Sequence, residues 1–166
     1  NSRLDYRNGK IYWTEIVPGL RWTHENYSVL KCYDLKEGRI KSITPRQRYL
    51  SPSVDKNGKV AAVSRTTVDG KNQLVLVELE DGKELFAFQV PGNAFIKELT
   101  FTDQDEVVAV AVTDAGISLL QFTPSSGQWE ELLSTASVNI TSPVWKDGRI
   151  YFESGANGTN NLYCLD

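Results

Sequence analysis

The sequence is poor in the residues that build catalytic and metal sites. It has one histidine, His24, two cysteines and no methionine among 166 residues. Two cysteines form neither a disulfide framework nor the paired spacing of a zinc site. No Gly-x-Ser-x-Gly elbow occurs, and the acidic stretch 102–106 lacks the glycine and the distal glutamate of a calcium loop. We therefore expect no catalysis by this chain, no metal and no cofactor.

Excess positive charge and long apolar runs are also missing. The net charge is -3, whereas a nucleic-acid-binding surface needs a basic stripe. No apolar stretch approaches the length of a membrane span, and the N-terminus lacks the anatomy of a signal peptide. We expect no nucleic-acid partner and no membrane-spanning segment. Because methionine is absent even at the start, we also expect an excised piece of a longer protein.

What the sequence does contain is a repeat. "SPSVDKNGKVAAVS" at 51–64 is echoed by "SPVWKDGRIYFES" at 142–154, and in both a turn precedes an apolar run. Turns of this kind stand at Gly9, Gly58, Asp105 and Gly148, and a second series stands at Gly38, Gly82 and Gly127. Both series recur about every 45 residues, which is the length of a propeller blade.

Each unit reads as four short β-strands. In the second unit they are expected at Ser51–Val54, Lys59–Ser64, Gln73–Glu78 and Leu85–Gln89, in runs that are apolar on both faces. Such runs suit sheets that are covered on both sides, while the alternating segment 38–43 suits an outer edge. A helix over 103–115 is the alternative, but its valines favour a strand. A two-sheet sandwich fits the regular period less well.

These repeats resemble those of the TolB-like, or WD40-like, β-propeller family. The shared pattern is Ser-Pro, then Asp/Asn-Gly-Lys, then an apolar strand and an acidic turn, as in 51–64 followed by "NQLVLVELEDGKEL". "WTEIVPGLRWTHENYSVLKCYDL" is similar to propellers of large bacterial envelope proteins, which implies a periplasmic or outer-membrane-associated setting. The first and third units depart from the Ser-Pro pattern. The resemblance predicts the fold and leaves function open.

The fold class that follows is all-β, a segment of about four four-stranded antiparallel blades. The expected blades span 2–44, 49–89, 95–133 and 140–166, and the last lacks its outer strand. We interpret them as an open arc of a ring of roughly six to eight blades, whose uncovered end faces should promote self-association. Cys32 and Cys164 occupy equivalent places in distant blades, so we expect two free, buried thiols.

One constellation of side chains points to binding. A long insert at 17–27 and the connection at 44–50 should emerge on the same face of a propeller. Their candidate partner-binding residues are Arg21, Trp22, His24, Arg46, Arg48 and Tyr49. Arginine, tryptophan and tyrosine dominate interface hot spots, and arginine binds carboxylates in a bidentate manner. The alternative is that the two aromatic residues fill packing gaps while the arginines are solvated.

Together these features predict a non-catalytic scaffold in the bacterial cell envelope that binds a protein or a peptide. One alternative is an accessory propeller that gates a larger peptidase or presents substrates to it. Another is a module that binds a carbohydrate or small ligand through Trp22 and neighbouring aromatic residues. The sequence alone leaves all three open.

Overall fold

The computed structural model describes residues 3–18, 26–135 and 138–165. Strands account for nearly all of the regular structure, and one 3-10 turn, η1 (Pro91–Asn93), is the exception among these residues. The described part contains no helix long and apolar enough to cross a membrane. The all-β prediction is confirmed.

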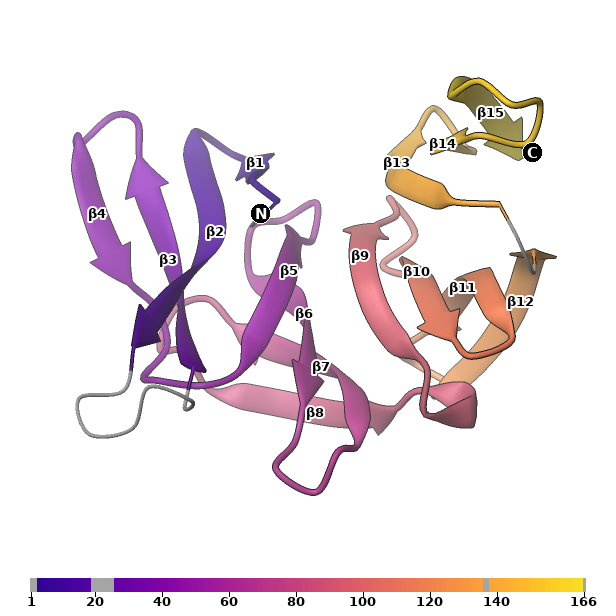
Figure 1. Cartoon of the computed structure of the whole chain (residues 1–166). Coiled ribbons are helices and arrows are strands. Elements are labelled where there is room, and N and C mark those ends of the chain that lie inside the picture. The colour runs from indigo at the N-terminus through magenta and orange to yellow at the C-terminus, as the bar shows by residue number, and fades with distance from the viewer. Residues whose placement is uncertain (1–2, 19–25, 136–137, 166) are drawn as a thin grey trace.

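The described residues form fifteen strands in four antiparallel sheets, which follow one another around an arc (Figure 1). The first sheet comprises β1 (Asp5–Arg7), β2 (Lys10–Pro18), β3 (Asn26–Asp34) and β4 (Arg39–Ser42). The second comprises β5 (Tyr49–Val54), β6 (Val60–Thr66), β7 (Asn72–Glu78) and β8 (Glu84–Gln89). The third comprises β9 (Phe95–Phe101), β10 (Val107–Thr113), β11 (Gly116–Thr123) and β12 (Gln128–Thr135). The fourth has β13 (Ile140–Lys146), β14 (Arg149–Ser154) and β15 (Asn161–Leu165). Strands pair in sequence order within every sheet, so each sheet is a meander, referred to below as a blade.

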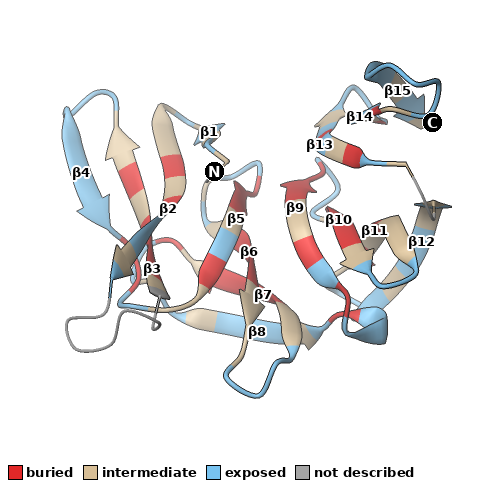
Figure 2. Ribbon diagram, viewed as in Figure 1, coloured by how far each residue is buried: buried red, intermediate tan, exposed pale blue. Residues whose placement is uncertain are grey.

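The core lies between the blades, and the middle strands of the second and third blades are buried on both sides (Figure 2). Along β10, alternate residues point to opposite neighbours, as a period of two requires. Val107 and Ala109 pack towards the second blade, and Val108 and Val110 pack against the fourth. Phe122 lies between the rings of Phe88 and Trp129, with centroids 4.6 Å away on each side. The segment for which a helix was the alternative is therefore a doubly buried strand.

The innermost strands are joined by hydrogen bonds from blade to blade. The Asp5 carboxylate accepts from the backbone N–H of Val54 at 2.5 Å, and the Ser53 hydroxyl accepts from Phe101 N–H at 3.0 Å. Between the third and fourth blades, the Glu98 carboxylate accepts from Ser142 N–H at 2.6 Å. Because each of these bonds crosses a blade boundary, they fix the angle between neighbouring blades.

The repeated Ser-Pro motif forms a bulge in the innermost strand. Ser51 and Ser142 have positive φ values of 49° and 55°, and the pairing register shifts at both places. The Ser51 hydroxyl donates to the backbone oxygen of Lys97 at 2.6 Å. A bulge bends its strand and increases the twist. The repeat is thus explained by backbone geometry.

The two thiols are both free, as predicted, but only one is buried. Cys32 is 7% exposed and faces the second blade, whereas Cys164 is exposed. Their places are equivalent, since Cys32 pairs with Tyr12 and Cys164 pairs with Tyr151. The expectation of a buried Cys164 is wrong because no described blade covers this face of the last sheet. The outer strand β4 is likewise more exposed than its alternating sequence predicts.

Candidate functional site

The end of the sheets at which β2 ends and β3 begins is here called the insert face. The antiparallel meander places the β6–β7 connection and the link between the first two blades at this same end. The link 43–48 is attached to the start of β3, because Ser28 and Gln47 exchange backbone hydrogen bonds of 2.6 and 2.8 Å. The start of β3, which follows the insert, is thus held against this link, whereas residues 19–25 of the insert lie outside the described residues.

A cationic cavity of about 280 Å³ opens on the insert face between the first two blades. Its lining comes from β3, from the link between blades and from the end of β6, and consists of Tyr27, Arg46, Gln47, Arg48, Arg65, Thr66, Thr67 and Val68. We call it the rim pocket. Arg46 is exposed and Arg48 is partly buried. Within the described part of the chain, neither guanidinium forms a hydrogen bond or an ion pair.

The third arginine of the rim pocket, Arg65, is held in place by its neighbours. One of its terminal nitrogens lies 2.5 Å from a carboxylate oxygen of Glu84, and its other nitrogens donate to Gln73 Oε1 at 2.9 and 3.1 Å. The guanidinium carbon lies 5.9 Å from the ring centroid of Tyr49, which is the cross-strand partner of Arg65. Arg65 therefore forms a neutralised, rigid wall of the pocket.

Tyr49 supports the rim pocket from below. The side chain is 1% exposed and packs with Val63, Val75 and Val77. Its hydroxyl donates to Glu84 at 2.5 Å. Burial, followed by the hydrogen bond to the Glu84 carboxylate and its negative charge, raises the pKa of the Tyr49 phenol. Tyr49 is therefore a core residue. Its ring packs in the protein interior, which was the alternative to partner binding.

The raised pKa of Tyr49 predicts a loss of stability at high pH. Below about pH 10 the phenol is protonated in both the folded and the unfolded chain. Above that pH the unfolded chain releases the proton while folded Tyr49 keeps it, so the free energy of unfolding falls. Tyr12 and Cys32, whose pKa values are also raised by burial, act in the same direction. Urea unfolding between pH 8 and 11 should therefore show a shallower loss for Tyr49→Phe than for the wild type. Parallel losses would contradict this assignment.

The structure describes only some of the six predicted site residues. Arg21, Trp22 and His24 lie outside the described residues. Of the six candidates, the structure brings Arg46 and Arg48 together in the rim pocket and places Tyr49 beneath it. Arg65 was missed by sequence reasoning. The signal for it was the alternation of β6, which puts Arg65 on the same face as Val63 and opposite Tyr49.

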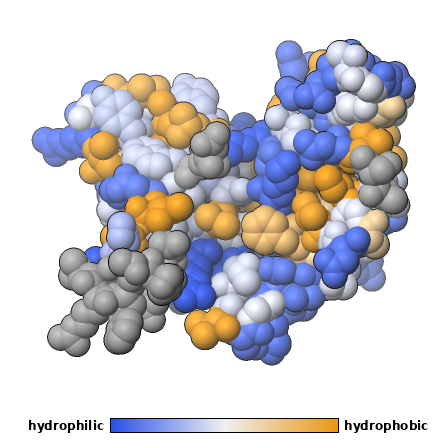
Figure 3. Space-filling view, in the orientation of Figure 1, coloured by the Kyte–Doolittle hydropathy of each residue, from blue (hydrophilic) through white to orange (hydrophobic). Residues whose placement is uncertain are grey.

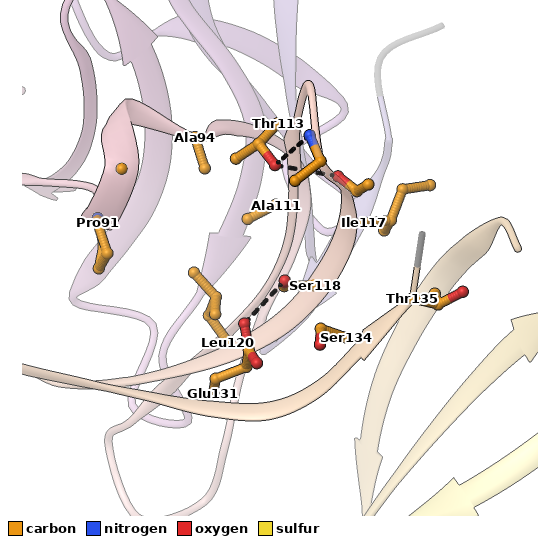
Figure 4. Close-up of a pocket in the computed structure, with 13 residues that line it drawn as sticks. Pro91, Ala94, Ala111, Thr113, Ile117, Ser118, Leu120, Glu131, Ser134 and Thr135 are labelled. Carbon is orange, nitrogen blue, oxygen red and sulfur yellow. Dashed lines mark hydrogen bonds between the residues drawn. The ribbon is translucent and has the colours of Figure 1, made fainter. Parts of the chain in front are cut away.

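A second cavity, of about 460 Å³, lies on the insert face at the third blade (Figure 4). Pro91 and Ala94 form one side, and β12 contributes Glu131 and Ser134 on the other. The Ser118 hydroxyl donates to Glu131 at 3.0 Å. In the space-filling view, hydrophobic side chains gather over this part of the molecule (Figure 3). The cavity carries a single charged side chain, so its chemistry is far less distinctive than that of the rim pocket.

A third cavity, of about 510 Å³, lies at the opposite ends of the first two blades. Lysines and glutamates mix in its lining, and Lys41 already donates to the backbone oxygen of Glu80 at 3.2 Å. Elsewhere in the described ranges, no three histidine, cysteine, aspartate or glutamate side chains are placed to hold a metal ion. Of these three cavities, the rim pocket is accordingly the one whose lining has the most pronounced charge.

The comparisons with known proteins bear on the fold. No protein-family model and no curated protein sequence matches the chain. Solved structures do match. The propeller domain of the trilobed protease from Pyrococcus furiosus, described as having an open velcro topology, superposes over 99% of this chain and 53% of its own, with a TM-score of 0.68 and 13% identity. The chain is a β-propeller.

Two other structures extend this likeness. TolB from Acinetobacter baumannii superposes over 95% of the chain with a TM-score of 0.68 and 17% identity. The acylaminoacyl peptidase of Pyrococcus horikoshii covers 99% with a TM-score of 0.69 and 12% identity. This propeller spans only 39% and 31% of those two chains, respectively. The predicted resemblance to TolB-like propellers is confirmed at the level of fold, and identities this low carry no activity with them.

Proposed function

We propose that this propeller is a non-catalytic scaffold that binds a protein or peptide partner on its insert face. The observation that carries the proposal is the pair of arginines, Arg46 and Arg48, which line a cavity and have no partner among the described residues. Arginine is among the residues enriched at interface hot spots. The rigid wall formed by Arg65 and Tyr49 pre-organises the site.

The proposed setting is the bacterial cell envelope, in the periplasm or at the outer membrane. Support comes from the sequence resemblance to envelope propellers and from the structural likeness to TolB. The proposal that the chain has no catalysis of its own rests on its composition, which offers one histidine and no recognisable nucleophile elbow.

A selection from a random peptide library tests this function. The immobilised chain should enrich a family of related peptides, and Arg46→Ala/Arg48→Ala should lose that enrichment. Lys36→Ala/Arg39→Ala is the matched control, because it removes two exposed cations from the opposite end of the first blade. Equal enrichment by the wild type and the rim variant would remove the rim pocket as the binding site.

An accessory role in a larger peptidase is the second candidate. The observation that favours it is the likeness to the propellers of the trilobed protease and acylaminoacyl peptidase. A propeller that presents substrates to a peptidase should accept many sequences weakly, whereas a recognition scaffold should select one consensus. The same library selection therefore separates the two: a broad, unrelated set of retained peptides favours the accessory role.

A further inference from the structure

The hydrogen-bonding groups of the rim pocket are divided between two walls. On one wall are the guanidinium groups of Arg46 and Arg48, which are unpaired within the part of the chain that the structure describes. Each presents donors in a flat fork, which matches the two oxygens of a carboxylate. Arg65 adds no free donor of comparable strength, because Glu84 and Gln73 already engage its nitrogens. The donors available to a ligand are thus concentrated on one side.

The other wall presents acceptors. The Thr66 hydroxyl donates its proton to Asn72 Oδ1 at 2.6 Å, and the Thr67 hydroxyl lies 2.5 Å from Asp69 Oδ1. The Thr67 oxygen already accepts from the Lys71 N–H at 3.0 Å. Since each hydroxyl has a single proton, what these threonines offer a ligand is their remaining oxygen lone pairs. The Thr67 hydrogen bond and then Lys71 lower the pKa of the Asp69 carboxyl to about 2. Because Lys71 Nζ lies 2.9 Å from this carboxylate, the pair adds little net charge to the wall.

A ligand that fits both walls needs a flat, two-oxygen anion at one end and N–H donors beside it. A phosphate fits less well, because its further oxygens would face the threonine oxygens. A peptide carboxylate fits well, since the flanking amides supply N–H groups. A long polyanion is also disfavoured by the net charge of -3.

We propose that the rim pocket is a carboxylate-recognition site, in which Arg46 and Arg48 bind a peptide carboxylate while Thr66 and Thr67 accept hydrogen bonds from the peptide amides. The inference rests on the proposed function and names the chemistry of its ligand. The carboxylate comes from an acidic side chain or from a chain terminus, and both present the same two oxygens. Because Arg46 is exposed and Arg48 only partly buried, binding should weaken as salt is added.

Backbone amide shifts of the 166-residue chain, followed by NMR, provide the test. Four probes are titrated: acetyl-Gly-Gly-Asp-Gly-amide, acetyl-Gly-Gly-Gly with a free carboxylate, its C-terminal amide, and inorganic phosphate. We expect shifts around Gln47, Thr66 and Thr67 with one or both carboxylate peptides, and the stronger of the two identifies the source. Arg46→Ala/Arg48→Ala should weaken binding about tenfold or more, Arg48→Lys by less, and Lys36→Ala/Arg39→Ala should not weaken it.

Three outcomes would overturn the inference: the amide binds as well as the acids, phosphate binds more tightly than either, or the rim variant binds as the wild type does. Failure here is distinguishable from failure of the proposed function. If the library yields a consensus without a carboxylate that still needs Arg46 and Arg48, the scaffold role stands and carboxylate recognition fails. If the library selection is indifferent to the rim variant, the proposed function fails as well.

Discussion

Gly82→Ala is expected to destabilise this propeller by about 2–5 kcal/mol, since it combines overpacking with a strained backbone. Gly82 occupies the turn between β7 and β8 with a φ of 76°. A Cβ placed there would lie 2.0 Å from the backbone oxygen of Ile43 and 2.9 Å from its carbonyl carbon. That carbonyl has little room to retreat, because the N–H of Ile43 is bonded to Leu30 O at 2.8 Å and its side chain is buried.

Gly70→Ala is the matched control for this prediction. Gly70 has nearly the same φ, 78°, but no atom lies within 4 Å of the added Cβ. It should cost only the left-handed backbone penalty, about 1–2 kcal/mol. The difference between the free energies of unfolding of the two variants in urea therefore measures the cost of the contact between the turn at Gly82 and the link 43–48. Equal destabilisation would mean that the turn at Gly82 does not touch that link.

The strands of this chain could be predicted from sequence because their signals are local. The second unit was expected to hold strands at Ser51–Val54 and Gln73–Glu78, and the structure has them at Tyr49–Val54 and Asn72–Glu78. Apolar residues on both faces of a strand indicate a sheet whose two faces are both covered. In agreement, residues Val107 to Val110 are fully buried. The turn at Asp105, read as a substitute for glycine, has the left-handed φ of 61° that such a position requires.

The burial of single side chains was harder to predict, because it depends on neighbours far away in the sequence. Cys32 and Cys164 have the same local surroundings, yet only the first is covered by a following blade. Tyr49 directly follows the polar link that carries Arg46 and Arg48, which suggests an exposed ring. Its burial is decided by Val63, Val75 and Val77 of two other strands. The candidate site was found through Arg46 and Arg48, whereas the residues that shape it needed the fold.

Tyr49→Ala is the second substitution for which we expect a large effect, a loss of about 3–5 kcal/mol in the free energy of unfolding. The ring is 1% exposed, and its removal leaves a cavity beside three buried valines. Tyr49→Phe keeps the ring and loses only the hydrogen bond to Glu84, so it should cost about 1 kcal/mol. Glu84 still has Arg65 as its partner in both variants.

Tyr6→Ala serves as the control for Tyr49→Ala, because it removes the same side chain from a site that is 60% exposed. Its effect should stay within about 0.5 kcal/mol. Removal of the Tyr49 ring should also disturb the rim pocket, since the ring lies under the Arg65 guanidinium. Tyr49→Phe should therefore retain peptide binding, while Tyr49→Ala should weaken it even where the chain remains folded. If Tyr49→Ala costs no more stability than Tyr6→Ala, the ring does not support this part of the second blade. That result would also contradict the proposal that Tyr49 and Arg65 form a pre-organised wall of the rim pocket.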